Sequence, residues 1–178
     1  MTEAIRGARE TVHVEFYIAA LDDLTRPFFE AMASAAERGV TVRFLFDHIG
    51  SRGIPVHREM LKFLKDSRIE WHPMLPIQPL KGRFRRPDLR NHRKLVVVDG
   101  EIGFTGSLNL IERGYNKPKN HKHGREWVEL MLRLEGPVVA SLEIVFAGDW
   151  WLETDERLQV VGHPVTGGAP ESIHGVPC

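Results

Sequence analysis

Four polar side chains are spaced so that a single hairpin would bring them together. His92 and Lys94 open an apolar run that ends at Asp-Gly, and the chain then returns through a second run to Ser107 and Asn109. An Asp-Gly dipeptide between two apolar runs is among the stronger local signals for a two-residue hairpin turn. The pattern therefore predicts two antiparallel strands with these four side chains at their open end.

The turn also predicts the register of the two strands. With the Asp-Gly dipeptide as the whole loop, Lys94 lies opposite Thr105 and His92 lies opposite Ser107. Because side chains alternate along a strand, His92 and Lys94 emerge on one face. Ser107 and Asn109 can reach the same region from the partner strand.

These groups together suit a phosphate ester. An ammonium group attracts the phosphoryl charge, hydroxyl and amide groups donate hydrogen bonds to its oxygens, and an imidazole can attack phosphorus or shuttle a proton. Each residue alone has an ordinary structural interpretation: a polar strand end for His92, an edge residue reaching solvent for Lys94, a turn residue for Asp99, and a loop or cap for Ser107 and Asn109. Their joint occurrence at these separations favours the phosphate site.

Alternating strand and helix signals surround the hairpin. The segment Thr11–Leu21 is β-branched and aromatic, and the next one has Thr25 as an N-cap, Pro27 in its first turn and Gly39 as a stop. Later segments predict strands over Val40–Asp47, Arg68–Pro73 and Arg125–Gly136, and helices over His57–Lys65 and from Pro137 onward. This order predicts an α/β fold with a mixed, largely parallel sheet flanked by helices.

The sequence predicts one domain over residues 1–152 and a Pro/Gly-rich tail or linker over residues 153–178. A long irregular segment, Met74–Asn91, precedes His92, and long loops of this kind are often functional. From Lys81 to Lys94, seven lysines or arginines stand against Asp88 alone. This basic segment is either a solvated loop or part of the anion site that begins at His92.

The composition excludes several classes of protein. Twenty-four basic and 24 acidic side chains give a formal net charge of zero, so only local clusters can attract an anionic partner, and a general nucleic-acid binder is not the first expectation. The single cysteine, Cys178, excludes an intramolecular disulfide. No apolar run is long enough to cross a membrane and no signal peptide is recognisable, so we expect a location in the cytoplasm or peripheral to the cytoplasmic membrane.

The hairpin residues resemble the signature of the phospholipase D superfamily, HxKxxxxDxxxxxxGSxN. The matching residues are His92-Arg-Lys94, Asp99 and Gly106-Ser107-Leu-Asn109. The stretches "AIRGARETVHVEFYI", "AAERGVTVRFLFDHIGSRG" and "LEGPVVASLEIVFAGDW" extend the resemblance to the N-terminal half of bacterial cardiolipin synthases. The resemblance covers residues 4 to 151.

In that family the motif histidine attacks a phosphodiester and becomes a phosphohistidine, without a metal or other cofactor. The resemblance implies that His92 is the nucleophile. It also implies that Lys94, Ser107 and Asn109 hold the phosphoryl oxygens. The motif aspartate is Asp99, whose place in the turn indicates a supporting role in the hairpin.

A carboxylate on the strand after the motif orients the histidine in relatives. The resemblance implies Glu129 for this role, although related synthases tend to have Asp there. Glu15, on the first strand, is the minor candidate. His121 and His123 are too few to indicate a metal site, and a solvated loop is the ordinary interpretation of that pair.

The family reaction needs a second histidine to protonate the leaving oxygen, and the sequence holds one copy of the motif. Three hypotheses follow. The chain is an incomplete half of a cardiolipin-synthase-like transphosphatidylase acting on phospholipids such as phosphatidylglycerol. Alternatively, two copies form a homodimeric phosphodiesterase or nuclease, or the chain is a catalytically silent phosphate-binding domain. The expected partners are a phospholipid, a second motif-bearing half or a second copy, and a peripheral membrane surface, with nucleic acid ranked behind them.

Overall fold

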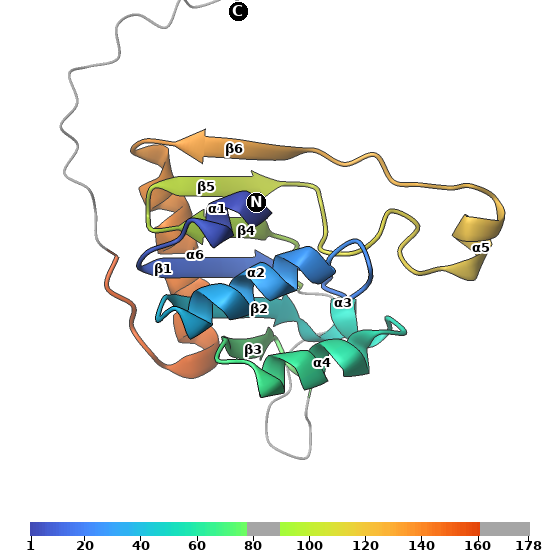
Figure 1. Ribbon diagram of the computed structural model, residues 1–178, viewed down its shortest axis with the longest axis horizontal. Helices are drawn as coiled ribbons and strands as arrows, with labels where there is room; N and C mark the ends of the chain where they lie inside the picture. The colour runs from blue at the N-terminus through green and yellow to red at the C-terminus, as the bar shows by residue number, and fades with distance from the viewer. Residues whose placement is uncertain (78–89, 161–178) are drawn as a thin grey trace, which may run out of the picture.

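A six-stranded mixed sheet forms the centre of the fold, with the strand order β3-β2-β1-β4-β5-β6 (Figure 1). The computed structural model describes residues 1–77 and 90–160. The strands are β1 (Thr11–Phe16), β2 (Thr41–Asp47), β3 (Glu70–Met74), β4 (Lys94–Val98), β5 (Ile102–Gly106) and β6 (Met131–Glu135). The first three strands pair in parallel, whereas β4, β5 and β6 extend the sheet antiparallel from β1. The predicted mixed α/β sheet is confirmed, and its parallel pairing is confined to β1, β2 and β3.

Helices cover both faces of the sheet. They are α1 (Thr2–Arg6), α2 (Arg26–Glu37), α3 (His48–Arg52), α4 (His57–Asp66), α5 (Pro118–Lys122) and α6 (Val138–Thr154). Figure 1 shows α1, α2 and α4 in front of the sheet and α6 behind it. The front core contains Phe29 and Met60, and the rear core contains Phe146 and Trp150 of α6. Alternate side chains of the strands complete both cores: in β4, Val96 and Val98 belong to the front core, and Leu95 and Val97 to the rear one.

The predicted elements form with shifted bounds. The strand expected over Arg125–Gly136 is regular only from Met131 to Glu135. Helix α6 begins after Pro137 and ends at Thr154, so it includes the first two residues of the predicted tail. Residues 78–89, which contain most of the basic segment, and residues 161–178 of the tail lie outside the described residues. Among the residues described, no helix combines the length and apolar character that a bilayer crossing requires.

The β4–β5 hairpin turns at Asp99 and Gly100, as the dipeptide predicts. These two residues have φ angles of +52° and +65°, the left-handed values that a type I′ turn requires. The N–H of Glu101 donates to the carbonyl oxygen of Val98 at 3.0 Å and closes the turn. Val98 then pairs with Ile102, so Glu101 is an extra residue outside the ladder.

The extra residue makes the predicted register wrong by one place. Leu95, rather than Lys94, lies opposite Thr105. A shift of one residue moves a side chain to the other face of its strand, so the ladder itself does not put Ser107 beside His92. Strand β5 instead ends at Gly106, and the following residues cross the end of the sheet until Leu110 bridges to Ala19, just after β1.

The carboxylate of Asp99 ties the turn to the start of β1. It accepts hydrogen bonds from the backbone N–H groups of Arg9, Glu10 and Thr11 at distances between 2.8 and 3.2 Å. The turn is thereby fixed against the beginning of β1, whose partner strand is β4. Asp99 thus sets how β4 lies along β1.

Replacing Asp99 tests this tie. We expect Asp99→Ala to lower the free energy of unfolding by about 1.5–3 kcal/mol, because three backbone donors lose a charged acceptor. Asp99→Asn is the matched control, since it keeps one acceptor oxygen and tolerates the left-handed conformation. Chemical denaturation measures both. Equal stability of Asp99→Ala and the parent chain would contradict the assignment.

Candidate active site

His92 lies just before β4, and its exposed imidazole rests on Tyr17. The two rings stack with centroids 3.8 Å apart and an interplanar angle of 17°. Tyr17 directly follows β1, the strand at which the parallel and antiparallel halves of the sheet meet. His92 also lines a surface hollow of about 480 Å³ together with Asn91, Arg93 and Asp149. The imidazole is therefore supported on one side and faces open space suited to a substrate.

Lys94, the first residue of β4, lies beside the same tyrosine. Its side chain is buried, with the residue 8% exposed, and Nζ lies 5.4 Å from the centre of the Tyr17 ring. Nζ donates a hydrogen bond to the backbone carbonyl of His92 at 2.6 Å. Burial lowers the pKa of Lys94, while the carboxylate of Glu129 opposes that change. A desolvated ammonium close to the imidazole gains from an incoming anion.

Asn109, Tyr115 and Glu129 form a chain of hydrogen bonds next to this pair. The Asn109 side-chain oxygen accepts from the N–H of Ile18 at 3.1 Å, and its amide group donates to the Tyr115 hydroxyl at 2.8 Å. That hydroxyl donates to Glu129 at 2.7 Å. Burial and the neighbouring Glu129 raise the pKa of Tyr115 to about 12, so the phenol remains a donor at neutral pH.

Ser107 holds the end of β5 against the segment that carries Glu129. Its hydroxyl oxygen accepts from the N–H of Leu130 at 2.9 Å, and its own N–H donates to the Leu130 carbonyl at 2.8 Å. The preceding residue must be glycine, because a Cβ at Gly106 would lie 2.1 Å from the Leu130 carbonyl oxygen. The Gly-Ser pair thus allows close approach of the two backbones and fixes where Glu129 emerges.

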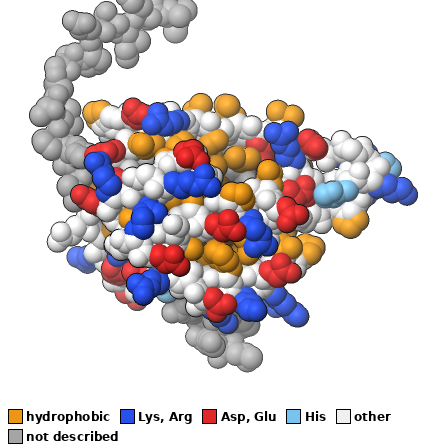
Figure 2. Space-filling model, in the orientation of Figure 1, with side chains coloured by type: hydrophobic (Ala, Val, Ile, Leu, Met, Phe, Trp, Pro, Cys, Tyr) orange, Lys and Arg blue, Asp and Glu red, His pale blue; other side chains and the backbone are white. Residues whose placement is uncertain are grey.

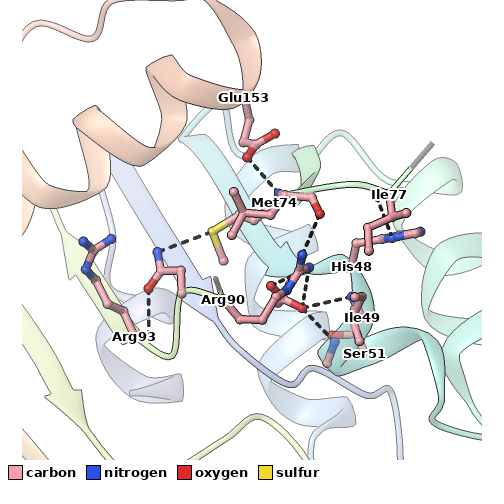
Figure 3. A network of polar contacts seen from close by, with 12 residues as sticks. His48, Ile49, Ser51, Met74, Ile77, Arg90, Arg93 and Glu153 are labelled. Atoms are coloured by element: carbon pink, nitrogen blue, oxygen red, sulfur yellow. Dashed lines mark hydrogen bonds and ion pairs between the residues drawn. The ribbon is translucent and has the colours of Figure 1, made fainter. Parts of the chain in front are cut away.

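The segment that precedes His92 is held in place by a buried ion pair (Figure 3). The guanidinium of Arg90 lies 2.8 Å from the carboxylate of Asp47, and these side chains are 5% and 0% exposed. Arg90 also donates to the carbonyl of Leu75 at 2.9 Å. Figure 3 shows Arg90 reaching between the ends of two segments. The Asp47 carboxylate also accepts hydrogen bonds from the N–H groups of Ile49 and Gly50 at the start of α3.

A group of carboxylates lies beside the hollow on the α6 side. Asn91 donates to Glu15 at 2.6 Å and to Asp149 at 3.0 Å, and Arg93 pairs with Asp149. Glu15 is fully buried. Burial first, and Asp149 second, raise the pKa of Glu15 to about 8. Glu15 is therefore largely protonated at neutral pH.

The structure brings some of the predicted site residues together and separates others. His92, Lys94, Asn109 and Glu129 surround the end of β1, while Ser107 supports them through the backbone. Asp99 stands at the far end of β4, five residues and about 16 Å along the strand from Lys94, so its side chain supports the hairpin rather than the site. Glu129 accepts a hydrogen bond from Tyr115, and the described contacts of His92 are with Tyr17 and Lys94.

Sequence reasoning missed Tyr17, Tyr115 and Asp149. Tyr17 and Asp149 act through partners far along the chain, and local spacing does not indicate such contacts. The short separation of Asn109 and Tyr115 was the one available signal. In residues 1–77 and 90–160 no group of three or more His, Cys, Asp or Glu side chains is placed so that it could hold a metal ion.

The raised pKa of Glu15 gives a pH dependence with a definite sign. The fold favours the neutral carboxyl, whereas the unfolded chain ionises near its ordinary value of 4.5. Unfolding between these values releases a proton, so this contribution to stability is complete at low pH and is lost as pH rises toward about 8. We expect Glu15→Gln to raise the melting temperature more at pH values above 8 than near 5. Glu30→Gln, on an exposed face of α2, is the control, and parallel melting curves for Glu15→Gln and the parent chain would contradict the assignment.

Three comparisons place these features among known proteins. The family described as cardiolipin synthase, phospholipase D-like domain matches residues 1–150. Cardiolipin synthase A of Wigglesworthia glossinidia brevipalpis is 37% identical over 86% of this chain, and that of Proteus mirabilis is 36% identical over 88%. The alignments cover 30% and 32% of those two proteins, so the chain spans about a third of their length.

Solved structures share the fold at lower identity. Nuc, a phospholipase D family member from Salmonella typhimurium, superposes with a TM-score of 0.63 at 19% identity and covers 88% of both chains. NucT from Helicobacter pylori gives a TM-score of 0.60 at 16% identity, with 83% of each chain covered. With a family match across residues 1–150 and its motif hairpin in place, this chain belongs to the cardiolipin synthase, phospholipase D-like domain family.

Proposed function

We propose that this chain supplies one half of a phosphodiester-cleaving site for phospholipids, with His92 as a covalent nucleophile. The observation that carries the proposal is the placement of the His92 imidazole at the hollow, stacked on Tyr17, whose ring centre also lies 5.4 Å from the buried Lys94 ammonium. Membership of the cardiolipin synthase family supports a phospholipid such as phosphatidylglycerol as the substrate class.

The reaction proceeds in two displacements. A ring nitrogen of His92 attacks phosphorus, the P–N bond forms, and the bond from phosphorus to the leaving alcohol breaks as that oxygen takes a proton. Water or a lipid hydroxyl then attacks the phosphorus of the phosphohistidine and gives its proton to the group that protonated the leaving alcohol, and the P–N bond breaks. Lys94 and Asn109 stabilise the negative phosphoryl oxygens in both steps, because each presents N–H donors near the end of β1, where His92 stacks on Tyr17.

Tyr115 and Glu129 position the clamp. The Tyr115 hydroxyl accepts a hydrogen bond from the Asn109 amide group and donates a hydrogen bond to Glu129. This arrangement leaves the other amide hydrogen of Asn109 for a phosphoryl oxygen. Glu129 also keeps Lys94 charged, since its carboxylate raises the lysine pKa against the effect of burial.

The leaving oxygen needs a second acid, which we assign to another motif-bearing unit. Among the described residues that line the hollow, His92 is the one histidine. The curated relatives are about three times as long as the matched segment, so a second half fits within their additional length. The chain is thus proposed to act as a half-enzyme that becomes complete when a second imidazole faces His92.

A homodimer is the second candidate for the complete site. The similarity to Nuc favours it, because a phospholipase D family member of closely matching length aligns over 88% of both chains. In this arrangement two copies of His92 face one another across a two-fold axis and act on a phosphodiester. A silent phosphate-binding domain is the remaining reading, and the following experiments separate it from the other two.

Replacing the nucleophile tests the covalent step. We expect His92→Asn to abolish the phosphoenzyme and to reduce turnover of phosphatidylglycerol on the order of a millionfold, because no other group can form the P–N bond. Mass spectrometry of peptides prepared without acid detects the phosphohistidine adduct, and an assay of headgroup release measures the rate. His123→Asn, at an exposed histidine outside the hollow, is the matched control. An adduct that persists in His92→Asn would refute the assignment.

Subunit composition tests how the site is completed. If two copies complete the site, we expect turnover by the isolated chain to rise with the square of protein concentration at low concentration and to follow the dimer fraction measured by light scattering. If a second half is required instead, the isolated chain remains inactive whether monomeric or dimeric. Turnover by a strict monomer would exclude the two-histidine arrangement.

A further inference from the structure

Residues 113–130 leave the body of the domain and return to β6 as an arm that carries α5. Figure 1 shows α5 beyond the end of the sheet, joined to the body by two extended segments. We call these residues the α5 arm. Most of its side chains are exposed, and its base is fixed where Tyr115 and Glu129 share a hydrogen bond. The arm therefore projects from the candidate active site.

Basic side chains gather on the α5 arm, although the whole chain is neutral. They are Arg113, Lys117, Lys119, Lys122 and Arg125. Arg113 pairs with Glu126 at 3.6 Å. Within the described residues the other four cations make no ion pair at 4 Å or less. An unbalanced cluster of this kind attracts an anionic surface.

Large apolar side chains stand next to these cations. Trp127 is 59% exposed, Val128 is 99% exposed and Leu130 is 64% exposed. Tyr115 packs against the Trp127 ring with a centroid distance of 5.7 Å, which supports the indole in its outward position. Apolar residues of this size beside a cationic cluster characterise segments that lie in the interface of a bilayer.

The arm also contains a hollow of about 560 Å³. Lys117, Asn120, Arg125 and Trp127 line it, together with Gly124 and Glu126. Two cations and an amide can bind a phosphate group, and the indole provides an apolar wall for the adjoining glycerol or acyl chain. The hollow thus offers contacts both to the phosphate group and to the apolar part of an anionic lipid.

We propose that the α5 arm docks on a bilayer that contains anionic phospholipid, with a lipid phosphate in its hollow and Trp127, Val128 and Leu130 in the interface. Charge complementarity and the aliphatic residues select this partner. Nucleic acid would bind the cations and the indole, but it has no apolar surface that would cover the exposed Val128. A second copy meeting the arm through the same surface would oppose cations to cations.

This inference rests on the proposed function, because it explains how a site for phospholipids meets its substrate. Tyr115, at the base of the arm, bonds directly to Asn109 of the phosphate clamp. Docking of the arm therefore holds the clamp close to the headgroup layer. A substrate headgroup then has only to move laterally to reach His92.

Vesicle sedimentation tests the docking. The full chain carrying His92→Asn is used, so that no turnover alters the lipid, with vesicles of phosphatidylcholine alone or mixed with phosphatidylglycerol. We expect binding only to the mixed vesicles. Combined Lys117→Glu, Lys119→Glu and Lys122→Glu substitutions should weaken that binding at least about 100-fold, since each basic residue near an anionic membrane contributes roughly a factor of five.

Matched variants isolate the arm. Lys62→Glu, Lys65→Glu and Arg68→Glu make the same charge change on and after α4 and should leave most of the binding. Trp127→Ala should weaken binding, whereas Trp151→Ala, at an exposed tryptophan of α6, should not. Circular dichroism checks that each variant folds. Equal losses in the arm and α4 triple variants, or vesicle binding that survives the arm variants, would overturn the proposal.

Two further outcomes are decisive. If single-stranded DNA binds the arm more tightly than mixed vesicles and displaces them, the assigned partner is wrong. If the parent chain hydrolyses phosphatidylglycerol in detergent but fails to bind vesicles, the docking proposal fails and the proposed function stands. If the chain binds vesicles but shows no turnover even when a second motif-bearing half is supplied, the docking proposal stands and the proposed function fails.

Discussion

The buried carboxylate of Asp47 is the interaction on which the arrangement of the site depends. It accepts hydrogen bonds from the N–H groups of Ile49 and Gly50, which starts α3, and it pairs with Arg90. Through α3 it fixes the support of the imidazole, because Gly50 packs so closely on Tyr17 that a Cβ there would lie 2.4 Å from the Tyr17 carbonyl oxygen. Through Arg90 it fixes the backbone two residues before His92. One carboxylate thus sets both the ring beneath the nucleophile and the segment that carries it.

The ion pair between Asp47 and Arg90 fixes the position of the segment before His92 more than it stabilises the fold. Burying a guanidinium and a carboxylate costs much of what their attraction returns, so such a pair is weak evidence of a more stable fold. Breaking it would leave an uncompensated buried charge, which makes alternative placements of the segment unfavourable. Lys94 follows the same logic at the site itself, since its burial lowers the lysine pKa and leaves an ammonium that gains from a phosphoryl group. This electrostatic arrangement fits the proposed binding of a phosphoryl group.

Local sequence predicts those parts of the fold that depend on local rules. The Asp-Gly turn, the β-branched strands and the helix opened by Pro27 each reflect the conformational preference of nearby residues, and each forms where expected. The register of β4 and β5 depends instead on whether Glu101 joins the ladder. That choice is coupled to the bonds of Asp99 with residues 9–11, almost ninety positions away in the chain.

The partners of the site residues escape prediction for the same reason. Tyr17 meets His92 only because β1 and β4 are neighbours, and Asp149 meets Asn91 only because α6 crosses behind the sheet. The motif spacing names His92, Lys94 and Asn109 but does not reveal that a crossing segment, rather than the ladder, delivers Asn109 to the end of β1.

Continuity of the chain connects recognition of phosphate with approach to a surface. The residues that follow the Gly-Ser-Leu-Asn segment run directly into the α5 arm, and the arm returns through Glu129 to β6. Figure 2 shows basic side chains at the tip of this arm, on a molecule whose remaining visible surface mixes both signs of charge. Because the net charge is zero, the long-range field cannot orient the protein, and orientation must come from such a local cluster. The segment that ends in the phosphate clamp is therefore also the segment best placed to direct that clamp toward an anionic surface.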